Sequence, residues 1–187
     1  MLQRTDAADA IDPLMRPFFE RSGLAALRLG GRALLPIVQG GMGVGVSAHK
    51  LAGNVASLGG VGTISSVDLR RHHPDLMERT QGLASRPGMD ADTKAVIDAA
   101  NLEAIGREIR AARVLSEGRG LLAINVMRAV AEYAASVKKA LEAGIDAVVV
   151  GAGLPLDLPD LASDHPDALL VPILSDARGV QLIVKKW

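Results

Sequence analysis

The stretch LLAINVMRAVAEYAASVKKALEAGIDAVVV, residues 121–150, decides the fold class, because it places a helix between two short apolar runs. The runs 121–126 and 147–150 have the length of strands and are almost continuously apolar, which is typical of parallel strands buried on both faces. Between them, apolar side chains recur at helical spacing over 129–144, and Gly144 supplies a helix stop. The stretch therefore predicts a strand, a helix and a second strand parallel to the first.

The same alternation continues on both sides of this unit. Further apolar runs of strand length lie at 33–38, 61–65 and 169–174, and helical patterns lie at 47–60, 100–116 and from 177 onward. Ser47 is placed to cap the first of these helices. The order predicts an α/β protein with a parallel sheet, built either as an open doubly wound sheet or as part of a (β/α)8 barrel.

The chain divides into a lead-in and a repeating part. Residues 1–32 have no strand–helix alternation, and we expect one short helix there that ends at Gly23. Residues 33–187 hold the βα units. Within them, 66–99 has no strong period and is long for a loop in a compact domain, so we expect either a lid over the binding face or a mobile segment.

Composition narrows the functional classes. The chain has 21 basic and 21 acidic residues, and this balance argues against a nucleic-acid binder. It has no cysteine, which excludes disulfides and thiolate metal sites and favours a cytoplasmic location. No uncharged apolar run approaches the ~20 residues of a membrane span, and the N-terminus has no signal-peptide pattern. We therefore expect a cytoplasmic protein with a small-molecule partner.

The most distinctive candidate site is the glycine-rich stretch PIVQGGMGVGVS, residues 36–47, which follows an apolar run and precedes a helix. Its spacing does not match the G-x-G-x-x-G pattern of dinucleotide-binding turns, although Asp68 lies where a ribose-binding acid would be expected. Such a turn serves either a ligand that needs close backbone approach or a tight connection between a strand and a helix. Both interpretations remain open from these residues alone.

Small or polar residues also follow the other predicted strands. Asn125 ends one strand, Gly151 begins the loop GAGLP, and Ser175 begins SDARG. Because the carboxyl ends of parallel strands meet at one edge of a sheet, these residues are candidates for a shared site. Asn125 could equally hydrogen-bond its own turn, and GAGLP could be an ordinary loop.

Histidine spacing gives no indication of a metal site. None of the four histidines, His49, His72, His73 and His165, forms an H-x-x-x-H or H-E-x-x-H pair. We expect them on solvated loops and predict no metal.

Taken together, five stretches resemble the nitronate monooxygenase family, also called 2-nitropropane dioxygenases. They are LPIVQGGMGVGVS (35–47), GGVGTISS (59–66), AINVM (123–127), DAVVVGAGLP (146–155) and VPILSDARG (171–179). The resemblance covers roughly residues 28–187. It implies a parallel (β/α)8 barrel of the TIM type, here truncated to about five βα units, that binds FMN without a covalent bond.

The resemblance also implies site residues. The backbone of Gln39, Gly40, Gly41, Met42 and Gly43 would lie beside the isoalloxazine ring, Asn125 would hydrogen-bond its polar edge, and Gly151 and Ser175 would line the same mouth. The implied reaction is oxidation of an alkyl nitronate by oxygen to a carbonyl compound and nitrite.

The chain departs from the family in one respect. The family's next strand ends in a Gly-Gly-His-x-Gly motif with a catalytic histidine, and a phosphate site follows it; neither occurs before Trp187. The catalytic residue is therefore unassigned. We expect a partial barrel that associates with a second copy or with a C-terminal half. Flavin enoyl reductases share a similar glycine turn, so an FMN-dependent enoyl reductase, a non-catalytic barrel module and a Rossmann dehydrogenase domain are the alternatives.

Overall fold

The structure, a computed structural model, describes residues 10–83 and 90–187. The strands are β1 (Leu27–Leu29), β2 (Arg32–Leu34), β3 (Val61–Ser65), β4 (Leu121–Met127), β5 (Ala147–Gly151) and β6 (Leu169–Pro172). The helices are α1 (Arg16–Ser22), α2 (His49–Ser57), the 3₁₀ turn η1 (Leu69–His72), α3 (Pro74–Thr80), α4 (Ala91–Ser116), α5 (Tyr133–Glu142), α6 (Leu158–Leu161) and α7 (Ala177–Lys186).

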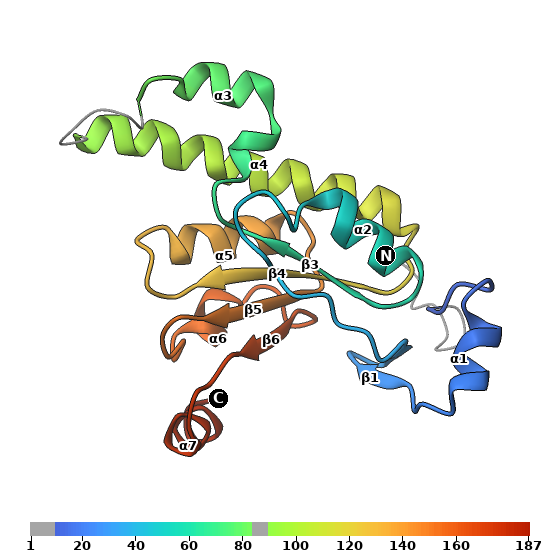
Figure 1. The fold of residues 1–187 in the computed structure, drawn as a ribbon. Coiled ribbons are helices and arrows are strands. Elements are labelled where there is room, and N and C mark those ends of the chain that lie inside the picture. Colours follow the sequence, from blue (N-terminus) through green and yellow to red (C-terminus); the bar gives the residue numbers. More distant parts are fainter. Residues whose placement is uncertain (1–9, 84–89) are drawn as a thin grey trace.

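The centre of the fold is a parallel sheet whose strands lie in chain order, β3-β4-β5-β6 (Figure 1). The α/β class and the parallel strands predicted from 121–150 are thereby confirmed. In the register of the sheet, Ser65 lies beside Asn125, and Met127 lies beside Gly151. The carboxyl ends of three strands therefore meet at one edge, as the sequence predicted.

Residues 33–38 were expected to form one strand, and this is wrong for most of the segment. Arg32–Leu34 pairs antiparallel with Leu27–Leu29 in a hairpin, and only Val38 forms a parallel bridge, to Val61. The hairpin turn is Gly30-Gly31, with φ of 55° and 74° at the two glycines. This backbone matches the tight turns that join antiparallel strands, and Gly-Gly favours them. In LRLGGRAL, residues 27–34, apolar and basic residues alternate around Gly-Gly, and this indication of a hairpin was overlooked.

One face of the sheet is covered by helices. Side chains of β3, β4 and β5, among them Ile64, Ile124 and Val148, are fully buried in one core with α2, α4, α5 and α6. The longest of these helices, α4, contacts both α2 and α5 and spans the layer (Figure 1). The helices thus lie on the same side of the sheet.

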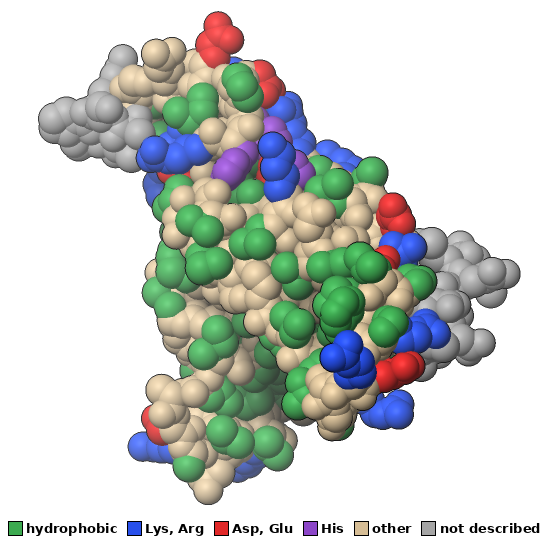
Figure 2. Space-filling model, turned by 45° about the vertical axis from the view of Figure 1, so that its right-hand side comes forward, with side chains coloured by type: hydrophobic (Ala, Val, Ile, Leu, Met, Phe, Trp, Pro, Cys, Tyr) green, Lys and Arg blue, Asp and Glu red, His purple; other side chains and the backbone are tan. Residues whose placement is uncertain are grey.

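The opposite face has a much smaller cover. Val61, Leu121, Ala123 and Ala147 pack with Ala10 and with the apolar side chains of the β1–β2 hairpin at the amino ends of the strands. Exposure is higher at the two borders of the sheet: Val38, which bridges to the first residue of β3, is 61% exposed, and Ile173, directly after β6, is 54% exposed. On the side of the molecule drawn in Figure 2, hydrophobic side chains lie across the middle and charged ones gather toward the margins.

The segment 66–99 was expected to be a loop, and the structure corrects this. It contains η1 and α3, and α4 begins at Ala91 rather than near residue 100. The Asp90 carboxylate accepts the Thr93 N–H at 2.7 Å and so caps α4, and Pro74 begins α3. Residues 84–89 of this segment lie outside the described residues. The expected lid is therefore largely helical and packs on the middle of α4, between Asn101 and Glu108.

Several smaller expectations also have outcomes. The short helix ending at Gly23 is confirmed, with Gly23 at φ 67°. The helix expected over 129–144 is shorter, Tyr133–Glu142. The helix expected from 177 is α7, which lies apart from the sheet at the end of an extended segment (Figure 1). None of the helices within residues 10–83 and 90–187 has the length and apolarity that a membrane crossing requires.

Asp146 ties the amino ends of the sheet to both covers. Its carboxylate accepts the Leu122 N–H at 2.8 Å and the Arg113 guanidinium of α4 at 3.0 Å, and Arg32 of the hairpin lies 3.4 Å away. Because the side chain is only 18% exposed, these bonds act in a partly dry environment.

We therefore predict that Asp146→Asn lowers the free energy of unfolding by about 2 kcal/mol, the scale of hydrogen bonds to a charged group. Denaturant titration followed by circular dichroism measures this. Asp164→Asn is the control, because Asp164 is exposed and lies outside the strands. Equal stability of both variants would show that the Asp146 bonds contribute nothing.

Candidate functional site

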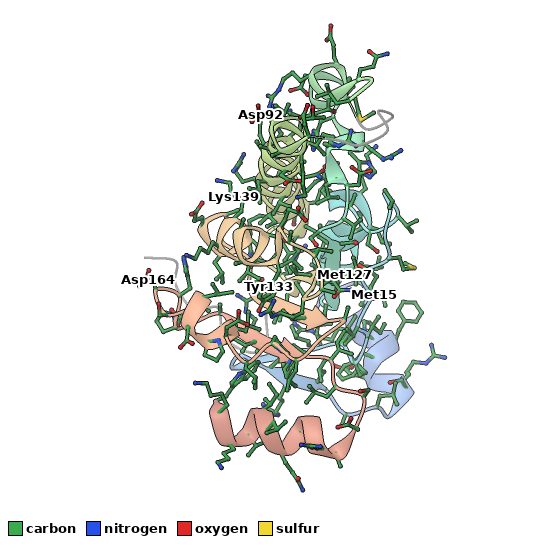
Figure 3. All side chains as sticks on the ribbon, turned by 90° about the vertical axis from the view of Figure 1, so that its left-hand side faces the viewer. Met15, Asp92, Met127, Tyr133, Lys139 and Asp164 are labelled. Atoms are coloured by element: carbon green, nitrogen blue, oxygen red, sulfur yellow. The ribbon has the colours of Figure 1, made fainter. Side chains whose placement is uncertain are left out.

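The candidate site lies at the carboxyl ends of the parallel strands. Figure 3 views the molecule from the side toward which the strand arrows of Figure 1 point, and Met127, the last residue of β4, lies near the middle of that view. The segment 39–47, here called the glycine turn, begins after the Val38 bridge to the first residue of β3, reaches this edge beside Ser65 and Asn125, and leads into α2. The turn is therefore one wall of the edge where the predicted site residues end their strands.

Two side chains hold the glycine turn in shape. The Gln39 amide oxygen accepts the Thr63 N–H at 2.9 Å, and its nitrogen donates to the Ser47 hydroxyl at 2.9 Å and to the Gly40 carbonyl. The Ser47 hydroxyl also donates to the Gly40 carbonyl at 3.0 Å and accepts the Met42 N–H at 2.9 Å. The turn is thus closed by its own polar groups.

This arrangement corrects the prediction that Ser47 caps α2. The cap position is Ala48, without a side-chain hydrogen bond, and the fully buried Ser47 points back into the turn. The His49 N–H at the start of α2 is instead accepted by Glu108 of α4 at 2.7 Å. A serine directly before a helix predicts an N-cap, but here the buried Glu108 carboxylate of α4 accepts the hydrogen bond at the start of α2 instead.

Packing within the protein accounts for three of the glycines. A Cβ at Gly41 would lie 2.5 Å from Asn125 Cβ, and one at Gly43 would lie 3.3 Å from Ser65 Oγ. Gly45 has φ of 78°, which favours glycine, and His72 lies against it. Gly40 differs, because nothing lies within 4 Å of its Cβ position. Of the four, only Gly40 leaves its side-chain space open to a ligand.

The structure brings the glycine turn and Asn125 together, as predicted. The Asn125 side-chain nitrogen lies 3.3 Å from the Gly41 carbonyl and donates to it, and no described residue hydrogen-bonds the Asn125 amide oxygen. Met42 is 48% exposed beside them. The side chain of Gln39, by contrast, is used inside the turn, so only its backbone remains available.

Gly151 and Ser175 lie farther along the same edge. Gly151 accepts the Arg128 N–H at 2.8 Å, and a Cβ there would lie 3.2 Å from Ile173. Ser175 lines a hollow of about 440 Å³ between the loops after β5 and β6 and the start of α7. Val171, the residue of β6 in register with Asn125, lies two strand spacings away, about 10 Å, and Ser175 follows it by four residues. Asn125 and Ser175 share an edge, with no contact between them.

Three residues at this edge were missed by sequence reasoning. The Arg128 guanidinium lies 4.6 Å from the centre of the Tyr133 ring and 3.3 Å from Asp157, to which the Tyr133 hydroxyl donates at 3.4 Å. Burial and the Asp157 charge raise the Tyr133 pKa to about 12. The group joins the loops after β4 and β5. The only indication of this group in the sequence was Arg128, which directly follows the strand β4.

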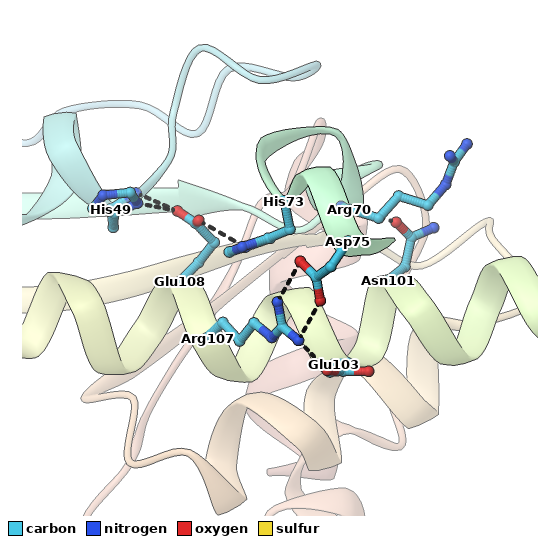
Figure 4. A network of polar contacts seen from close by, with 8 residues as sticks. All are labelled: His49, Arg70, His73, Asp75, Asn101, Glu103, Arg107 and Glu108. Atoms are coloured by element: carbon cyan, nitrogen blue, oxygen red, sulfur yellow. Dashed lines mark hydrogen bonds and ion pairs between the residues drawn. The ribbon is translucent and has the colours of Figure 1, made fainter. Parts of the chain in front are cut away.

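The histidines were expected on solvated loops, and for two of them this is wrong. The fully buried Glu108 lies 2.7 Å from His49 Nδ1 and 3.0 Å from His73 Nε2 (Figure 4). Next to this cluster, Arg107 of α4 pairs with Asp75 of α3 at 2.8 Å and lowers the Asp75 pKa. The two histidines thus pack α2 and α3 onto α4.

These histidines do not form a metal centre. Among residues 10–83 and 90–187, no three histidine or carboxylate side chains are placed to hold a metal ion. Glu108 accepts hydrogen bonds from its neighbours, and the cluster lies within the helical layer. Its role is structural.

We predict that Ser47→Ala destabilises the protein by about 2 kcal/mol, because it removes the fully buried hydroxyl that accepts the Met42 N–H and the Gln39 amide and donates to the Gly40 carbonyl. Thermal and denaturant unfolding measure the change. Ser57→Ala is the control, since the Ser57 hydroxyl only donates to the Asn54 carbonyl of its own helix. A loss no larger than that of Ser57→Ala would contradict the prediction.

Tyr133 is the one tyrosine of the chain, so its titration can be followed directly by tyrosinate absorbance. We predict an apparent pKa near 12, and a value closer to the usual ~10 in Asp157→Asn. Because the folded pKa is above the unfolded one, the contribution to stability is complete below about pH 10 and is lost as pH rises toward 12. An ordinary pKa in the folded wild-type chain would refute this.

Comparisons with known protein families and with curated proteins found no match for this chain. The resemblance stated above therefore still depends on the five stretches of sequence that carry it. The structure itself assigns the chain to the α/β class, with a four-stranded parallel sheet flanked by helices.

Proposed function

We propose that this chain binds FMN at the glycine turn and serves the oxidation of alkyl nitronates by oxygen in the cytoplasm. The observation that carries the proposal is the pairing of the turn with Asn125, which leaves Gly40 open and one amide oxygen unpaired. A flat ring needs backbone within contact distance and a hydrogen-bonding group at its edge. This pairing supplies both at one point.

The arrangement of the sheet supports a barrel-type scaffold for the site. Consecutive parallel strands with helices on one side form the wall of a (β/α)8 barrel, and such barrels carry their active sites at the carboxyl ends of the strands. We propose that β3 to β6, with the Val38 segment beside β3, are part of such a wall. A doubly wound dinucleotide-binding domain would have helices on both faces and a reversal in strand order.

The described residues fit the isoalloxazine ring of FMN better than they fit its phosphate. The Gly40 backbone, the exposed side chains of Met42 and Val44 and the Asn125 amide would meet the ring. At the other end of the edge, Arg178 lines the hollow beside Ser175, and no described residue pairs with its guanidinium, which makes it a candidate for the phosphate. Asp176 lies in the same lining and would repel that phosphate, so we expect weak binding.

FMN, when bound, supplies the redox chemistry of the reaction, in which a nitronate and oxygen give a carbonyl compound and nitrite. The chain's own part is to position the ring and to keep one face of it accessible. In this proposal Gly40 sets the distance of approach, and Asn125 fixes the orientation through a hydrogen bond. The catalytic proton acceptor remains unassigned.

The test begins with the visible spectrum of the purified chain mixed with FMN and then desalted. We predict retained, perturbed flavin absorbance in the wild type and its loss in Gly40→Leu, whose side chain would occupy the ring position. Gly106→Ala in α4 is the matched control, because a Cβ there meets only flexible side chains. Retention in Gly40→Leu equal to wild type would contradict this ring position, and no retention in any variant would contradict FMN binding.

The substrate is tested on flavin-loaded protein. Oxygen consumption with an alkyl nitronate supports the proposal, whereas NADPH oxidation with an enoyl thioester supports the enoyl reductase alternative. The two assays share the cofactor and differ in both substrates, so they separate these activities directly.

One observation favours a second candidate, a non-catalytic barrel module. In the described sheet β6 has a neighbour on one side only, and its own residue Val171 is 39% exposed. An open strand edge can pair with another chain. Analytical ultracentrifugation of the chain distinguishes a self-associating module from a monomer.

A further inference from the structure

The helix α7 exposes an apolar stripe that a surface helix ordinarily buries. Val180, Ile183, Val184 and Trp187, here called the α7 stripe, recur at the spacing of one helix face. Ile183 is buried, but Val184 is 75% exposed and Val180 is 47% exposed. Figure 1 shows α7 end-on below β6, whereas α4 and α5 run along the strands. Most of the stripe is therefore left without a cover by its own chain.

The place that the fold provides for a helix after β6 is open as well. A right-handed connection puts the helix that follows each parallel strand on the same face, so the helix after β6 belongs beside α6. Leu161 of α6 and Leu170 of β6 pack against the core on that face but stay partly exposed. These two residues and the loop 162–168 are here called the α6 surface. It is an apolar surface that a helix can cover.

The charges of the two surfaces are complementary. Lys185 and Lys186 lie in the last turn of α7, next to the stripe. The exposed carboxylates in and beside the α6 surface are those of Asp160, Asp164 and Asp167. Asp164 lies at the outer side of this loop (Figure 3). No described residue forms an ion pair with any of these five side chains. Opposite charges that lack partners on one chain favour contact between the two surfaces.

The backbone edge of β6 is a poorer route to association than these side chains. Leu169 and Ile173 donate their N–H groups to the β5 side. Because backbone groups alternate along a strand, the N–H positions of Leu170 and Pro172 face the open edge. Proline has no N–H, so this short edge has little to donate to a further strand.

We propose that two copies of this chain form a dimer in which each α7 stripe covers the α6 surface of the other copy. The chain's own α7 is held away from that surface, because Leu154 and Leu174 lie within 4 Å of the Cβ position of Gly179. A two-fold axis makes both contacts at once, with Lys185 and Lys186 against the carboxylates of the loop. This inference goes beyond the proposed function and is tested without FMN.

The experiment is sedimentation velocity of the full chain over a range of concentrations, together with the fluorescence of Trp187, the only tryptophan. We expect a monomer–dimer equilibrium with a dissociation constant of about 20 µM. Since Trp187 is 39% exposed in the single chain and belongs to the stripe, its emission should shift to the blue and its quenching by acrylamide should fall as the dimer forms.

One substitution tests the stripe. Val184→Glu should weaken the dimer at least tenfold, because it places a carboxylate against an apolar and acidic surface. Val114→Glu in α4 is the matched control, since Val114 is 77% exposed on another helix and should leave the dimer unchanged. Circular dichroism verifies that both variants are folded.

Charge reversal tests the pairing of the two surfaces. One variant carries Lys185→Glu with Lys186→Glu, and the other carries Asp160→Lys with Asp164→Lys. Each alone should dimerise about tenfold more weakly than the wild type, because like charges then meet in both contacts. A mixture of the two should recover the wild-type affinity, because both contacts of the mixed dimer join opposite charges.

Four results would overturn the proposal. The first is a monomer up to about 200 µM. The second is a monomer whose Trp187 is shielded only by anionic vesicles, as expected of a membrane-binding helix. A dimer that tolerates Val184→Glu would indicate another surface, such as the β6 edge. A dimer that tolerates Asp160→Lys with Asp164→Lys would indicate that the two α7 helices pair with each other.

Discussion

The handedness of the strand connections governs this fold. Crossovers between parallel strands are right-handed, so strands that pair in chain order place every connecting helix on the same face. β3 to β6 pair in this order, and α4, α5 and α6 follow from it. The second face of the sheet consequently depends on other parts of the chain, and at the amino ends the β1–β2 hairpin provides its cover.

The same constraint determines where chemistry can take place. With the hairpin at the amino ends, the accessible part of the sheet is its carboxyl edge, where the glycine turn, Asn125 and the Arg128 group lie. Two hollows, one beside Ser175 and one between β4, α4 and α5, open at this edge as well. Helices cover one face of the sheet, and the hairpin covers the other face at the amino ends of the strands. The carboxyl edge is the region that remains suited to ligands.

Sequence reasoning succeeded where one element decides its own structure. The strands at 61–65 and 121–126 and the stop at Gly23 follow from local apolar runs and a glycine. It failed where distant residues compete. Ser47 was predicted to cap α2, but Glu108, far along the chain, accepts the His49 N–H instead. Residues 66–99 were predicted to be irregular, although Pro74 begins α3 and Asp90 caps α4 within them.

The candidate site shows the same division. The proximity of Asn125 to the glycine turn was predictable, because both follow parallel strands. The reason for each glycine was not, since Gly41 is required by Asn125 and Gly45 by its own backbone, whereas Gly40 alone is unexplained by the protein. The Tyr133–Asp157 pair joins two loops whose spacing in sequence has no characteristic pattern.

The buried Glu108 has a consequence for how this sequence can diverge. His49, His73 and Glu108 come from α2, the start of α3 and α4, yet they form one polar cluster, in which His49 hydrogen-bonds one carboxylate oxygen and His73 Nε2 lies 3.0 Å from the other. Replacing the carboxylate alone would leave the His49 imidazole and the first N–H of α2 without their acceptor and would remove the charge beside His73. In related chains these three positions should therefore change together or not at all, which makes them a covarying set through which a distant relative could be recognised.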